Sequence, residues 1–213
     1  MDINFNLGEP RKPKWNAKKT QTVVGMGMLT ALVAVLQLFA SGIRLGPFSI
    51  TLTLVPIIIG AALYGWKAGA WLGFIFGVIV MFTPDVAVFM SVSVPATLVT
   101  VLLKGTLAGL GAGLVYTAIE KKNRTAAAVV SGIAAPIVNT GIFLLGCFMF
   151  FMEIVNGWSA AWAAEKGTAE NVLLYVIAGM VGWNFLVELA LNLLLSSAVV
   201  FIIDIVKKRM KIA

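Results

Sequence analysis

The 213-residue sequence contains no histidine and only one cysteine. The lack of histidine excludes histidine-based acid–base catalysis, Ser-His-Asp triads and the commonest protein metal ligand. Cys147 lies in an apolar run, so the sequence offers neither a disulfide nor a cysteine metal cluster. It also lacks a glycine-rich phosphate loop followed by Lys-Ser or Lys-Thr. We therefore expect no enzyme and no cofactor, and a transporter of this sequence would need an ion gradient or another subunit for energy.

Charged residues are scarce as well. They make up 12% of the chain, whereas 60% of residues are hydrophobic and the mean hydropathy is +0.99. This composition is typical of a polytopic membrane protein. The fold class predicted is an all-α membrane protein with six transmembrane helices, since about 20 apolar residues cross a bilayer. The spans are expected at residues 22–41, 48–65, 67–83, 92–118, 126–152 and 172–204.

Three parts of the chain are predicted. Residues 1–20 form a basic tail, residues 21–206 form the transmembrane substrate-binding domain, and residues 207–213 form a second basic tail. The first apolar run is of full length, so we expect an uncleaved span and not a signal peptide.

The basic residues indicate the orientation. With six spans, 13 of the 16 fall on one side of the membrane, while the other side holds Arg44 and Lys166, and Lys104 lies within a span. The positive-inside rule then places both termini in the cytoplasm. The net charge of +7 is therefore explained by topology, and no nucleic-acid partner is expected. The longest outer connection, residues 153–171, is predicted to be a loop over the bundle, either a lid or a solvated connection.

Polar residues inside the predicted spans are the candidates for ligand binding, because intramembrane charges are costly and usually functional. Asn184, Glu188 and Asn192 follow one another at i, i+4 and i+8, which forms a stripe about 12 Å long on a helix. Lys104 is the one basic residue deep in another span, and Asn139 lies near Pro136. Lys104 and Glu188 could serve a ligand, or they could pair with each other for purely structural reasons.

Small residues recur at helical spacing in three spans. Gly69, Gly73 and Gly77 form one ridge and Gly105, Gly109 and Gly113 another, and both predict close helix packing. In the first span, Gly27 and Ala31, and also Thr30 and Ala34, have the same spacing. This face could dock another protein or pack inside the bundle.

Several of these segments resemble one family. They are residues 45–53 (Leu-Gly-Pro-Phe-Ser-Ile-Thr-Leu-Thr), residues 56–60, the Tyr64-Gly65 pair, the first glycine ridge and residues 136–143 with Asn139-Thr140-Gly141. Together with the topology they resemble the substrate-specificity (S) components of energy-coupling factor (ECF) vitamin transporters. The resemblance implies a six-span protein of a prokaryotic plasma membrane that binds a vitamin near the outer surface. Lys104, Asn139, Asn184 and Glu188 would line that site, and Arg44 or Trp158 would cap it.

The resemblance also implies partners. S components dock on a transmembrane coupling subunit, through an Ala-x-x-x-Ala face of their first span, and work with two ATP-binding cassette ATPases. The matching positions here are Gly27/Ala31 and Thr30/Ala34, and neither pair has both alanines.

The ligand is expected to be anionic because Lys104 and Arg44 are candidates for the site. Pantothenate is favoured over riboflavin and folate, although the outer aromatic residues would suit a flavin ring. One alternative is a self-sufficient ion-coupled carrier or channel that uses Glu188, but the sequence has no convincing internal 3+3 repeat. Another is a non-transporting scaffold, which would require Lys104 and Glu188 to be buried against each other.

Overall fold

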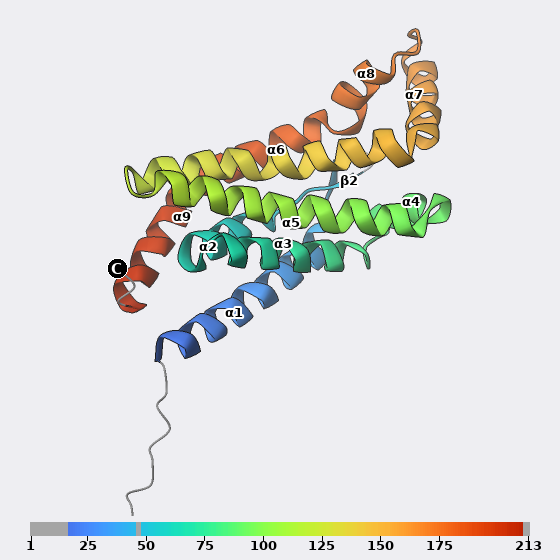
Figure 1. The fold of residues 1–213 in the computed structure, drawn as a ribbon. Coiled ribbons are helices and arrows are strands. Elements are labelled where there is room, and N and C mark those ends of the chain that lie inside the picture. Colours follow the sequence, from blue (N-terminus) through green and yellow to red (C-terminus); the bar gives the residue numbers. More distant parts are fainter. Residues whose placement is uncertain (1–16, 46–47, 211–213) are drawn as a thin grey trace, which may run out of the picture.

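The computed structural model describes residues 17–45 and 48–210, and at positions 17, 18, 44, 45 and 210 it describes the backbone alone. The protein is a bundle of helices with one small hairpin (Figure 1). In chain order the elements are α1 (Ala17–Ala40), β1 (Arg44–Leu45), β2 (Phe48–Ser49), α2 (Leu54–Tyr64), α3 (Trp66–Val80), η1 (Pro84–Val86), α4 (Ala87–Val92), α5 (Val94–Ile119), α6 (Arg124–Phe150), α7 (Met152–Lys166), α8 (Val172–Tyr175), η2 (Val176–Met180) and α9 (Gly182–Met210).

The expected multi-pass, all-helical membrane protein is confirmed in its general form. Within residues 17–45 and 48–210, the helices α1, α5, α6 and α9 are long and apolar enough to cross a bilayer. A fifth candidate is α3 together with η1 and α4, a pair bent by 77°. The remaining predicted span contains only the 11-residue α2, whose length of about 16 Å is short of the ~30 Å hydrocarbon core.

Two predicted spans are wrong in their outlines. Residues 48–65 are not helical throughout, because Phe48 and Ser49 pair with β1 as an antiparallel strand before α2 begins. Residues 172–204 are not one helix, because the π-helix η2 and a bend at Val181 separate α8 from α9. Glycine permits this bend: a Cβ added to Gly182 would lie 1.7 Å from the carbonyl oxygen of Ile177.

The predicted loop at residues 153–171 is mostly a helix, α7. Val155, Ser159 and Ala163 lie four residues apart and are all buried, so one face of α7 packs on the bundle. The helix ends at Gly167, whose positive φ of 64° allows a left-handed C-terminal cap. The alanine-rich sequence of its second half favours a helix, which hydropathy alone did not indicate.

The centre of the bundle is the contact of α3 with α5, where the two glycine ridges meet. A Cβ added to Gly73 would lie 2.1 Å from the carbonyl oxygen of Gly105, and one added to Gly69 would lie 2.4 Å from that of Gly109. The helix backbones therefore touch, as the sequence predicts. Phe76 and Lys104 adjoin this contact, so the ridges also fix how these two side chains face each other.

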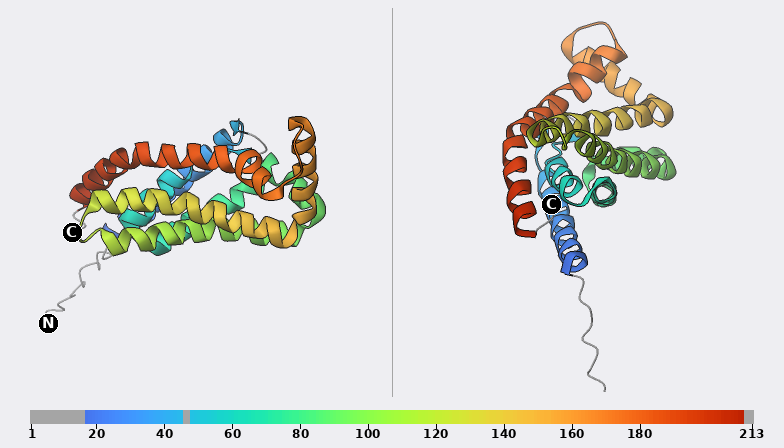
Figure 2. Two further views of the ribbon diagram at one scale, coloured as in Figure 1. Left: turned by 90° about the horizontal axis from the view of Figure 1, so that it is seen from above. Right: turned by 60° about the vertical axis from the view of Figure 1, so that its left-hand side comes forward.

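The two ends of the bundle differ. The start of α1 and the end of α9 lie at one end, called here the terminal end, and β1, β2, α4 and α7 lie toward the other, the cap end (Figure 2). At the terminal end two ion pairs hold α9 to α5 and α6: Lys207 with Glu120 at 2.9 Å, and Arg124 with Asp204 at 3.1 Å.

Candidate functional site

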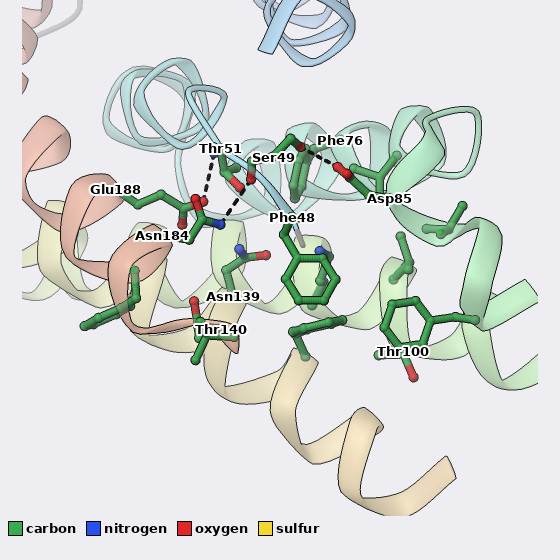
Figure 3. Close-up of a pocket in the computed structure, with 18 of the residues that line it drawn as sticks. Phe48, Ser49, Thr51, Phe76, Asp85, Thr100, Asn139, Thr140, Asn184 and Glu188 are labelled. Atoms are coloured by element: carbon green, nitrogen blue, oxygen red, sulfur yellow. Dashed lines mark hydrogen bonds between the residues drawn. The ribbon is translucent and has the colours of Figure 1, made fainter. Parts of the chain in front are cut away.

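A small cavity of about 60 Å³ lies in the cap half of the bundle, between α3, α5, α6, α9 and residues 48–51 (Figure 3). Six aromatic side chains line it: Phe48, Phe76, Phe89, Phe143, Phe151 and Phe185. Its polar lining consists of Gln37, Ser49, Thr51, Asp85, Thr97, Thr100, Lys104, Asn139, Thr140, Asn184 and Glu188. The structure thus brings together four of the predicted site residues, namely Lys104, Asn139, Asn184 and Glu188.

Lys104 supplies the positive charge of the cavity. Its ammonium nitrogen lies 5.0 Å from the ring centroid of Phe143 and 5.8 Å from that of Phe76, so two aromatic faces stabilise it. The ammonium makes no hydrogen bond or ion pair with any residue that the structure describes. The scaffold hypothesis would require Lys104 and Glu188 to be paired with each other. No salt bridge joins these two residues.

Three side-chain oxygens of the lining are buried without a hydrogen-bond partner in the described part of the chain: Thr100 Oγ1, Asn139 Oδ1 and Asn184 Oδ1. Buried polar atoms in native proteins almost always have a partner. Asn139 is only 5% exposed and comes from the middle of α6, three residues after Pro136. These oxygens and the Lys104 ammonium therefore offer hydrogen-bonding capacity that a polar ligand or water can use.

The other two predicted ligand residues contact the protein's own backbone. Residues 48–51, called here the cap segment, cross the cavity in an extended form (Figure 3). The Asn184 amide nitrogen donates to the carbonyl oxygen of Ser49 at 3.1 Å, and the backbone N–H of Thr51 donates to Glu188 Oε1 at 2.8 Å. The Ser49 hydroxyl donates to the carboxylate of Asp85. Three side chains from two elements thus hold the cap segment in place.

Phe48, the first residue of the cap segment, closes the cavity. Its ring centroid lies 5.0 Å from that of Phe143 and 6.1 Å from those of Phe89 and Trp158. Trp158 does not line the cavity itself, but it brings α7 against this aromatic cluster. A volume of about 60 Å³ holds a few waters, whereas small-molecule pockets usually have ~300–1,000 Å³. In this structure the cavity is therefore too small for a ligand of the usual size.

Of the remaining predicted residues, Asn192 lies apart from this lining. The backbone of Arg44 is in β1 opposite Ser49, but its side chain is outside the described part of the structure. Asn192 is buried one turn beyond Glu188 and donates to its carbonyl oxygen at 2.8 Å, facing Gly132 of α6.

Phe48 and Thr100 were not identified as site residues from the sequence. The sequence signal for Phe48 is its place directly after Gly46 and Pro47, a pair that is typical of a turn.

The predicted docking face lies on α1, which diverges from the bundle toward the terminal end (Figure 1). Gly27 and Ala31 are exposed, and nothing lies within 4 Å of a Cβ added to Gly27. Thr30 and Ala34 are half-buried. Among the described residues, the Gly27/Ala31 pair therefore does not serve internal packing.

Comparison with known proteins agrees with this arrangement. The family model described as "ECF transporter, substrate-specific component" matches residues 21–200. The chain is 27% identical over 199 residues to the pantothenic acid transporter PanT of Lactococcus lactis subsp. cremoris, an alignment that covers 85% of this chain and 93% of PanT. No solved structure matches the chain. Because the family model covers most of its length, this protein belongs to the family of substrate-specific components of ECF transporters.

Proposed function

We propose that this substrate-specific component captures pantothenate, with riboflavin and folate as the next candidates. The observation that carries the proposal is the Lys104 ammonium, which faces the cavity and forms no salt bridge with any acidic residue that the structure describes. A cation in an apolar bundle is costly unless a counter-charge meets it. A ligand carboxylate would supply that charge when it binds.

The rest of the lining suits the remainder of pantothenate, which carries one carboxylate, one secondary amide and two hydroxyls. Asn139 Oδ1 and Thr100 Oγ1 are buried acceptors that lack a donor within the described residues. The amide N–H and the hydroxyls of the ligand can provide such donors. The relative PanT, named as a pantothenic acid transporter, supports the same choice.

Riboflavin is the second candidate because of the aromatic cluster around Phe48. A flat ring could take the place of the Phe48 side chain between Phe89, Phe143 and Trp158. Riboflavin has no carboxylate, however, so it would offer Lys104 no anionic group to bind.

The topology and the partners complete the proposal. Six membrane crossings, with both termini in the cytoplasm, would place the terminal end on the cytoplasmic side of the cell membrane and the cap end on the external side. The exposed Gly27/Ala31 face of α1 would then dock a transmembrane coupling subunit, whose two ATPase subunits drive uptake. An ion-coupled carrier is not favoured, because Glu188 is already bonded to the backbone of Thr51 and the chain belongs to a family of substrate-specific components.

Ligand identification tests the proposal directly. The protein is purified from cells, and the small molecules that it carries are released by denaturation and identified by mass spectrometry. Titration of the ligand-free protein with pantothenate, riboflavin and folate then ranks the affinities. We expect pantothenate to bind most tightly. Binding of riboflavin alone would contradict the role of Lys104, and binding of none of the three would contradict the choice of vitamin.

A further inference from the structure

The cap segment is fixed through its backbone by two side chains of α9. Asn184 and Glu188 lie one helical turn apart and meet the carbonyl of Ser49 and the N–H of Thr51, two residues apart along the segment (Figure 3). Side chains that are i, i+4 on a helix lie about 6 Å apart, and alternate residues of an extended chain have a similar spacing. The spacing of Asn184 and Glu188 on α9 therefore matches the spacing of Ser49 and Thr51 in the cap segment, so both hydrogen bonds can form together.

We propose that Asn184 and Glu188 are positioning residues that clamp the cap segment over the cavity, and that the clamp controls how fast the vitamin enters and leaves. The proposal rests on the vitamin-binding function described above. It gives the two residues a role distinct from that of Lys104, which faces the cavity without a partner among the described residues.

The chemistry of Glu188 explains why the clamp holds. Its side chain is 2% exposed, and a buried carboxylate that loses a hydrogen bond bears a large desolvation cost. Moving the cap segment away would remove the Thr51 N–H from Glu188 and the Ser49 carbonyl from Asn184, whose own Oδ1 already lacks a partner in the described chain. Opening is therefore opposed by these two side chains of α9, in addition to Asp85, which accepts from the Ser49 hydroxyl.

The clamp must nevertheless open, because the closed cavity of about 60 Å³ is too small for a vitamin and Phe48 fills the space beside it. Once the Phe48 side chain has turned away, the same two backbone hydrogen bonds can form again over the bound vitamin, and the clamp then slows association and dissociation together. A residue that contacts the ligand behaves differently, since its loss mainly accelerates dissociation.

Hydrogen exchange of the Thr51 amide tests the clamp without any ligand. The full-length protein in lipid nanodiscs is compared with Glu188→Ala, Glu188→Gln and Asn184→Ala, and with Leu186→Ala as a control from a lipid-exposed position of the same helix. Glu188→Ala should exchange Thr51 about ten- to a hundredfold faster, since the Thr51 N–H is left without its acceptor. Asn184→Ala should give a smaller increase. Glu188→Gln keeps an acceptor oxygen and should remain within about threefold of wild type, as should Leu186→Ala.

Binding kinetics test the control of entry. Stopped-flow measurements with pantothenate should show Glu188→Ala raising both the association and the dissociation rate by about tenfold, with Kd changed by less than about threefold. A rise in Kd through dissociation alone would show that Glu188 contacts the ligand and would overturn the clamp. Unchanged exchange of the Thr51 amide in Glu188→Ala would also overturn the clamp. Loss of pantothenate binding in Glu188→Gln would overturn it too, because the carboxylate charge would then be essential for binding.

If Glu188→Ala does not fold, a substitution of Thr51, the hydrogen-bond partner of Glu188, still tests the clamp. Thr51→Pro removes the backbone donor and leaves Glu188 intact. It should raise both binding rates as Glu188→Ala does, and unchanged rates in this variant would contradict the proposal. If the wild-type protein binds none of the vitamins, the proposed function fails, but the exchange result still decides whether the clamp exists.

Discussion

The contact of α3 with α5 can be tested with a matched pair of glycine substitutions. A Cβ added to Gly73 would lie 2.1 Å from the carbonyl oxygen of Gly105 and 2.8 Å from its carbonyl carbon. Carbon and oxygen atoms rest at about 3.3 Å or more, so Gly73→Ala must push the helices roughly 1 Å apart. Overpacking of this kind usually costs about 1–3 kcal/mol. We expect Gly73→Ala to destabilise the bundle by that amount, offset in part by the better helix propensity of alanine.

Gly27→Ala is the control that isolates the clash. It is also a helical glycine, so it gains the same propensity of about 1 kcal/mol, but nothing lies within 4 Å of its added Cβ. The difference between the two variants is therefore the overpacking term alone. At roughly 2–4 °C per kcal/mol for a chain of this size, Gly73→Ala should melt about 2–12 °C below Gly27→Ala in the same detergent. Equal melting temperatures would refute the close approach of α3 and α5.

Three further predictions concern the membrane and the partners. Gly27→Leu should abolish uptake in cells and leave vitamin binding by the purified chain intact, because a bulky side chain blocks close helix approach; normal assembly with the coupling subunit would contradict this. A reporter fused after Lys122 should be cytoplasmic and one inserted near Lys166 external, and an internal Lys166 would rule out the six-span orientation. The purified chain in vesicles should bind pantothenate without accumulating it, whereas accumulation driven by a proton or sodium gradient would establish the ion-coupled carrier.

The apolar runs and the small-residue ridges were predictable because they depend on local composition and spacing. Gly73 and Gly105 meet as their spacing predicted, and α1, α5 and α6 lie within the apolar runs of the sequence. The break between α8 and α9 was not predictable in the same way. Residues 172–204 are mostly apolar on both sides of the break, and hydropathy carries no information on the direction of the backbone.

Some residues that line the cavity could be named from the sequence, but their contacts could not. Lys104 and Glu188 were identified because charges inside apolar runs are rare, and both line the cavity. The partner of Glu188 is the backbone N–H of Thr51, 137 residues away along the chain. Every residue except proline carries that group, so no side-chain pattern could have indicated it.

The central claim is that Lys104 binds the carboxylate of an anionic vitamin, and titration calorimetry of Lys104→Met measures it most directly. Methionine keeps most of the length and the apolar stem of the side chain and removes only the ammonium, which lies over the rings of Phe76 and Phe143. Loss of a charged hydrogen-bond partner in such a site costs ~2–5 kcal/mol, or roughly thirty- to several-thousand-fold in affinity. We expect pantothenate to bind Lys104→Met more weakly by this factor, with a melting temperature close to that of the ligand-free wild type. Binding of pantothenate with wild-type affinity would remove Lys104 from the site and contradict the account.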